Sequence, residues 1–185
     1  MIDKETAQKN FKIACKIYED SKKTIRELSD IAKSVAPKFS YEIAMAQYDL
    51  ILQAILLRTA MEDGYFLEEE LQFVQKITEY GDIMAYFKKK GVNVSWDIFN
   101  GGTDESRKEL SLTMLVALKE IADDFVTPFA IIDAALPKDY CEEITKQIGT
   151  ICLSLACCDG DTTNSDAFKH EAVVAVTLVN KTIKK

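Results

Sequence analysis

The chain has 185 residues, of which 48% are hydrophobic and 29% are charged, a composition typical of one ordinary globular domain. Only 7 glycines and 3 prolines are present, which argues against a β-sandwich or barrel, because these folds need many tight turns. Twenty-three basic and 30 acidic side chains give a net charge of −7. Such a surface repels nucleic-acid phosphates and anionic lipid, so neither is expected as a partner.

The sequence predicts a cytoplasmic protein without a membrane span. No stretch reaches the roughly 18 uncharged apolar residues that a membrane span requires, and the most apolar long segment, 43–61, is interrupted by Gln47, Asp49, Gln53 and Arg58. The first five residues carry charges of both signs and no apolar region follows them, unlike a secretory signal. The five cysteines are an odd number without regular spacing, which indicates a reducing compartment rather than a disulfide scaffold.

The first predicted element is a long helix from Lys4 to Ala36, ended by Pro37. Its apolar stripe follows a near-heptad pattern. We favour packing of this stripe on the chain's own core, and a coiled coil with another subunit is the alternative. The residues of the stripe are Phe11, Ala14, Tyr18, Ser21, Ile25, Leu28, Ala32 and Val35.

The second predicted helix begins after Ser40, a suitable N-cap, and runs to about Glu62. It is apolar on more than one face, which predicts a place at the centre of a bundle. A further helix is expected over 68–80, and Gly81 separates it from a short helix that continues to Lys90.

Residues 91–104 form the one irregular stretch, with the only tryptophan, Trp96, beside Ile98 and Phe99. We expect these large side chains to pack into the core, and a recognition loop is the alternative.

Three or four more helices are expected in the second half. Ser106 and Glu109 form a capping box for a helix that reaches Val126. Pro128 and Pro137 each suit the first position of a new helix, the former ending near Leu136. The last helix is predicted over 167–183. The sequence therefore predicts an all-α fold of seven or eight helices in total: a single compact bundle (38–185), to which the long N-terminal amphipathic helix (1–37) is appended.

The chain contains an internal repeat in which two helix–turn–helix segments lie ninety-six positions apart. Each copy has an apolar helix, then Asp-Gly, then a polar turn and an acidic residue in the first turn of the next helix. Helix capping is sufficient to explain this pattern. The matching positions are Ile55 and Ile151, Leu57 and Leu153, Ala60 and Ala156, Asp63-Gly64 and Asp159-Gly160, and Glu70 and Asp166.

On these residues, over about 41–183, the chain resembles the TerB-like family, the all-helical domain named for bacterial tellurite resistance. The segment from Ala60 to Glu70 is similar to that family's first turn, and the segment from Ala156 to Asp166 is similar to its partner turn. The resemblance implies a compact bundle, a divalent-cation role and a link to stress response, without a settled enzymatic activity.

The two turns together suggest a cation site. Ca²⁺ and Mg²⁺ prefer several oxygen ligands, and carboxylates brought together would repel one another unless a cation lay between them. Helix capping by solvated acids is the competing interpretation, and we give it more weight. The candidate metal ligands are Asp63, Glu70, Asp159, Asp161 and Asp166.

The sequence gives less support to a zinc site or to an enzymatic active site. Cys152, Cys157, Cys158 and His170 lack the close Cys-x-x-Cys pair of most zinc sites, so core packing is expected for Cys152 and Cys157. No nucleophile elbow, P-loop or dinucleotide fingerprint is found.

We therefore expect a non-enzymatic cytoplasmic module that binds an unidentified protein and a divalent cation. A protein-interaction or oligomerisation module, including a homodimer through the N-terminal helix, is the alternative. An enzyme acting near Trp96 is the third possibility.

Overall fold

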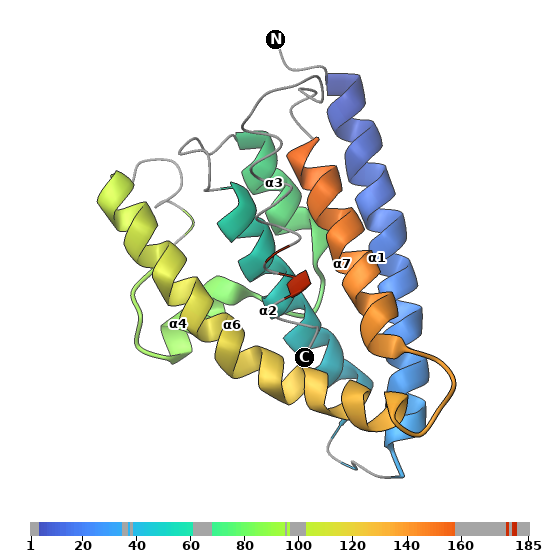
Figure 1. The fold of residues 1–185 in the computed structure, drawn as a ribbon. Coiled ribbons are helices and arrows are strands. Elements are labelled where there is room, and N and C mark those ends of the chain that lie inside the picture. Colours follow the sequence, from blue (N-terminus) through green and yellow to red (C-terminus); the bar gives the residue numbers. More distant parts are fainter. Residues whose placement is uncertain are drawn as a thin grey trace.

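The computed structural model of the chain describes residues 4–34, 37, 39–60, 68–94, 96, 103–157, 177, 179 and 180. Six helices and no strand are defined within these residues, which confirms the all-α prediction (Figure 1). The helices are α1 (Lys4–Ala32), α2 (Tyr41–Ala60), α3 (Glu68–Ile77), α4 (Ile83–Lys89), α6 (Asp104–Asp133) and α7 (Tyr140–Ala156).

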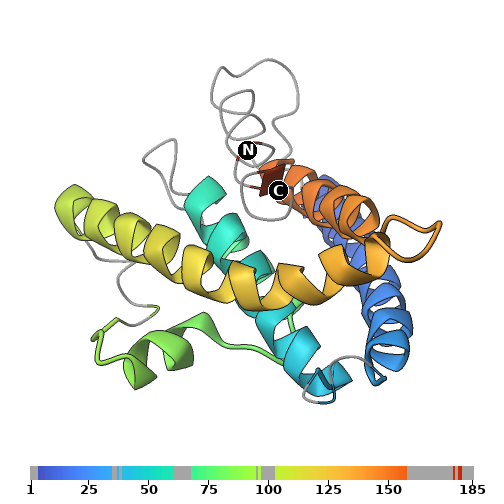
Figure 2. The same ribbon diagram turned by 60° about the horizontal axis from the view of Figure 1, so that its bottom comes forward.

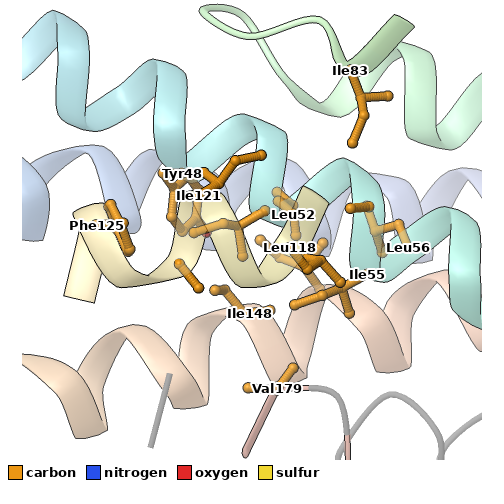
Figure 3. Packing of buried hydrophobic residues seen from close by; sticks show 14 of the residues in the cluster. Tyr48, Leu52, Ile55, Leu56, Ile83, Leu118, Ile121, Phe125, Ile148 and Val179 are labelled. Carbon is orange, nitrogen blue, oxygen red and sulfur yellow. The ribbon is translucent and has the colours of Figure 1, made fainter. Parts of the chain in front are cut away.

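Helix α2 is the centre of the bundle, as its apolar composition predicted. It contacts α1, α3, α4, α6 and α7, and Leu52, Ile55 and Leu56 are fully buried. They belong to one buried cluster with Leu118 of α6 and Ile148 of α7 (Figure 3). Because neighbouring helices surround α2, thirteen of its twenty residues are buried, and its apolar residues are not confined to one face.

Helix α1 lies antiparallel to α7, and this is the most extensive contact between two helices in the described part of the chain (Figures 1 and 2). The amide of Asn10 donates to the carbonyl of Cys157, and Thr24 donates to Glu143 further along the pair. From Ala14 to Ala32 the heptad stripe is buried in the chain's own core, as we favoured. One core cluster therefore includes residues on both sides of residue 37.

The prediction of two helices on either side of Pro128 was wrong, because α6 continues through it from Asp104 to Asp133. Proline inside a helix removes one backbone hydrogen bond and usually bends the helix, and α6 changes direction along its length (Figures 1 and 2). The buried neighbours Phe125 and Phe129 hold both parts in the core, so burial outweighs the local cost of the proline.

Two helix starts also differ from the prediction. Thr103 is the N-cap of α6 and accepts a hydrogen bond from the backbone of Ser106, so the helix begins before the predicted capping box. Asp139 is the N-cap of α7, which begins at Tyr140 rather than at Pro137. In both cases a side-chain oxygen satisfies an N–H of the first turn.

Two other predicted segments fall partly outside the described residues. Trp96 is half-buried and packs against the core, as expected, whereas Ile98 and Phe99 lie outside the described residues. The predicted last helix, 167–183, is described only at residues 177, 179 and 180, which are helical, and Val179 is buried in the core. No described helix combines the length and apolar character that crossing a bilayer requires.

Candidate functional sites

Only one of the five predicted cation ligands, Glu70, belongs to the described residues. It lies in the first turn of α3 and is 6% exposed. Asp63, Asp159, Asp161 and Asp166 lie outside the described residues, so the predicted site stays a prediction. The helices that precede the two turns, α2 and α7, contact each other, and their C-terminal ends lie toward the same end of the bundle (Figure 1).

The described residues contain no group of three or more side chains that could hold a metal ion. Of the four residues weighed for zinc, Cys158 and His170 lie outside the described part. Cys152 is fully buried in the core and Cys157 is half-buried at the end of α7. The complete burial of Cys152 confirms its predicted packing role, and this burial raises the pKa of its thiol to about 12.

The most elaborate polar arrangement in the described residues surrounds the buried carboxylate of Asp49, which the sequence analysis did not select. One oxygen, Oδ1, accepts a hydrogen bond of 2.8 Å from the Tyr18 hydroxyl. The other, Oδ2, accepts from the backbone N–H groups of Glu79, Tyr80 and Gly81 at 3.1, 2.6 and 3.0 Å. These three donors belong to the connection between α3 and α4.

One turn further along α2, Gln53 holds the same connection. Its side-chain oxygen accepts from the N–H of Ile83 at 2.8 Å, and its amide nitrogen donates to the carbonyl of Gly81 and to the hydroxyl of Thr78. Asp49 and Gln53 are four residues apart and therefore share one face of α2. Together they satisfy backbone groups that an irregular connection would otherwise leave unpaired inside the protein.

Burial raises the pKa of the Asp49 carboxyl, while the hydrogen bonds from Tyr80, Tyr18, Gly81 and Glu79 lower it; the net direction is upward. The pKa of Tyr18 is raised as well, by burial first and by the neighbouring Asp49 second. Because both oxygens of Asp49 already accept protein hydrogen bonds, the carboxylate acts as a structural clamp between α1, α2 and the α3–α4 connection.

Aromatic and basic side chains cover the outer side of this clamp. The Lys22 ammonium lies 5.8 Å from the ring centre of Tyr18, 6.0 Å from that of Tyr80, and 2.9 Å from the Glu79 carboxylate. The Tyr80 ring meets the ring of Tyr41 edge to face at 5.8 Å. These contacts further tie the α3–α4 connection to α1 and α2.

A different kind of surface lies on the N-terminal half of α6. Leu112 is 65% exposed and Val116 is 64% exposed, the two highest values among the exposed large hydrophobic side chains of the described residues. They are four residues apart and therefore adjacent on one helix face. We call this pair the α6 face.

Charged side chains of opposite sign flank the α6 face. At about 100° per residue, Lys108 and Lys119 lie on one side of it, the basic edge, and Glu109 and Glu120 lie on the other, the acidic edge. All four side chains are exposed. Glu120 also accepts hydrogen bonds from Lys90 at 3.0 Å and from Tyr86 at 3.3 Å, which places α4 beside the acidic edge.

The sequence holds some signal for the Asp49–Gln53 pair and less for the α6 face. A charged residue followed four positions later by an amide, within an otherwise apolar helix, marks Asp49 and Gln53 as side chains that need partners inside the protein. Leu112 and Val116 fall outside the inner stripe that Leu110, Met114 and Leu118 form, but the sequence does not show whether a neighbouring element covers them.

Comparison of the chain with known protein families, with curated proteins and with solved structures finds no match.

Proposed function

We propose that the chain is a non-enzymatic protein-interaction module whose contact surface is the α6 face. The observation that carries this proposal is the exposure of two adjacent large aliphatic side chains, Leu112 and Val116, on one helix. Complete burial of such a side chain stabilises a complex by about 1.5–3 kcal/mol. In the unbound protein Leu112 and Val116 remain largely in contact with water, so a partner that covers them would gain this free energy.

The surroundings of the pair also support a contact surface. Protein interfaces usually have an apolar centre with a polar rim that stays partly hydrated. Here the basic edge and the acidic edge form such a rim around Leu112 and Val116. From Ala14 to Ala32, by contrast, the N-terminal heptad stripe is buried in the chain's own core, so this part of the stripe does not support an interface.

Site-specific photo-crosslinking in cells tests the proposal. A photo-reactive amino acid at Leu112 should yield a discrete adduct with one partner protein on irradiation. The matched control is the same substitution at Ile131, which is 56% exposed and lies nineteen residues further along the same helix. Absence of an adduct from position 112, or an identical pattern from position 131, would contradict the proposed contact surface.

A second candidate function is divalent-cation binding of the kind that the TerB-like resemblance implies. It is supported by the repeated turn in the sequence and by the buried carboxylate of Glu70 at the start of α3. Calorimetric titration of the parent and of the Asp63→Ala/Asp159→Ala variant with Ca²⁺ and Mg²⁺ tests it. Flat traces for both proteins would remove the idea. A cytoplasmic location is proposed with either function, supported by the odd number of cysteines.

A further inference from the structure

The two edges of the α6 face carry opposite charges, and this arrangement restricts which partner helix fits. Lys108, Lys119 and Glu109 are exposed and make no ion pair with the other described residues. Glu120 keeps its exposed contact with Lys90. Charged positions that flank an apolar seam set the orientation and the identity of a helical partner, as they do in coiled coils.

A second copy of the same helix is complementary in only one orientation. If two copies of α6 run parallel about a twofold axis along the helices, the basic edge of each copy faces the acidic edge of the other. If they run antiparallel about a perpendicular twofold axis, the basic edge faces the basic edge and the acidic edge faces the acidic edge. Like charges in such positions oppose association.

We propose that the occupant of the α6 face is a second copy of this chain, paired through parallel α6 helices about a twofold axis. This inference rests on the proposed function and names its partner. Leu112 and Val116 of each copy form the apolar centre, and Lys108 and Lys119 face the acidic edge of the second copy. The contact is isologous, which is the commonest arrangement in homodimers.

The dimer is weak. Two aliphatic side chains per copy bury far less than the roughly 1,200–2,000 Å² of a stable interface, and each copy carries a net charge of −7. We therefore expect a dissociation constant on the order of tens of micromolar or weaker. Sedimentation equilibrium at protein concentrations up to several hundred micromolar covers that range.

Charge reversal tests the parallel arrangement. The Lys108→Glu/Lys119→Glu variant has two acidic edges, and the Glu109→Lys/Glu120→Lys variant has two basic edges. Each variant alone should dimerise at least tenfold more weakly than the parent, whereas their equimolar mixture should associate at least as strongly as the parent. Leu112→Ser/Val116→Ser should lower the association of the parent by a similar factor. Thermal unfolding of each variant checks that it remains folded, which matters most for Glu120→Lys because of the Lys90 contact.

Three outcomes would overturn the inference: a parent that stays monomeric over the whole range, variants that dimerise as the parent does, or a mixture that fails to associate. In an antiparallel pair, edges of like charge already face each other in the parent. Reversing the charge of one edge would again leave like charges opposite each other, so the association would change little. A monomeric parent whose Leu112 photo-adduct contains a different protein would refute the second copy and leave the proposed function intact. A monomeric parent without any adduct would contradict both.

Discussion

The hydroxyl of Tyr18 on α1 donates a hydrogen bond of 2.8 Å to the carboxylate of Asp49 on α2, thirty-one residues away in the sequence. The same hydroxyl accepts a hydrogen bond from the backbone N–H of Glu79 at 3.1 Å. A single carboxylate and a single phenol therefore join three segments of the chain. This explains why a charged residue occupies a fully buried position in the most apolar helix of the bundle.

Removal of the Asp49 carboxylate should destabilise the fold strongly. In Asp49→Ala, the N–H groups of Tyr80 and Gly81 lose their acceptor inside the protein, and the Tyr18 hydroxyl loses its own. The hydrogen bond from Tyr18 is buried, and those from Tyr80 and Gly81 are partly buried. A buried donor left unpaired costs about 1–3 kcal/mol, so we expect a total loss of about 3 kcal/mol. Urea unfolding measures it. Asp49→Asn keeps one carbonyl oxygen and should lose less; an equal loss in both variants would contradict the hydrogen-bond explanation.

The upward direction of the Asp49 pKa predicts the sign of a pH effect. Because burial raises the pKa of this carboxyl in the folded state, the folded protein binds the proton more tightly than the unfolded chain does. The contribution to stability is therefore fully present below the ordinary aspartate pKa of about 4 and decreases as the pH rises through the folded pKa.

The difference in unfolding free energy between the parent and Asp49→Asn isolates this group, because asparagine does not titrate. That difference should fall as the pH is raised from about 4 and then level off. A difference that rises over the same interval would mean that the hydrogen bonds from Tyr80, Tyr18, Gly81 and Glu79 outweigh burial.

Much of the fold could be predicted from the sequence, because helix boundaries depend on local chemistry. Ser40 caps α2 through the N–H of Ile43, as predicted, and the break at Gly81 separates α3 from α4. The helix start predicted at Pro128 failed because the preference of proline for a first turn is weaker than the burial of the aromatic side chains around it.

The features selected from the structure were harder to predict, because they depend on what lies opposite each residue. The spacing of Asp49 and Gln53 shows that they share a face, but not that a connection thirty residues later supplies the hydrogen-bond donors. In the same way, the exposure of Leu112 and Val116 depends on which elements fail to cover them. The predicted cation ligands form a third case, since four of the five lie outside the described residues.

Thiol reactivity tests the buried environment of the cysteines. Burial, together with a hydrogen bond and the charge of Asp133, raises the pKa of Cys141 to about 12, although its side chain is only half-buried. At pH 8 its thiolate fraction, and therefore its alkylation rate, should be on the order of a thousandfold lower than in the unfolded chain.

Iodoacetamide labelling followed by peptide mass mapping, with and without urea, measures the rate. The N–H groups of Tyr140 and Cys141 donate to different oxygens of Asp133. Asp133→Asn removes the charge and keeps an acceptor for one of these two groups, and it should speed the labelling of Cys141. Equal rates for native and unfolded Cys141 would contradict the raised pKa.

The last prediction concerns two glycines that differ in the space around them. A Cβ atom at Gly81 would lie 2.7 Å from the carbonyl oxygen of Ala46 and 2.8 Å from the Cβ of Asp49. Both contacts are to α2, so Gly81→Ala would push the α3–α4 connection away from Asp49 and Gln53. We expect a loss of about 2–3 kcal/mol in the free energy of unfolding, measured in urea.

Gly149 is the matched control, because it lies inside α7 and a Cβ there meets nothing within 4 Å. Gly149→Ala should raise stability by about 0.5–1 kcal/mol, since alanine loses less backbone entropy in a helix than glycine does. If Gly81→Ala lowers the free energy of unfolding and Gly149→Ala raises it, the loss at Gly81 comes from its close approach to α2. A Gly81→Ala variant as stable as the parent would show that the connection does not need its contact with Asp49.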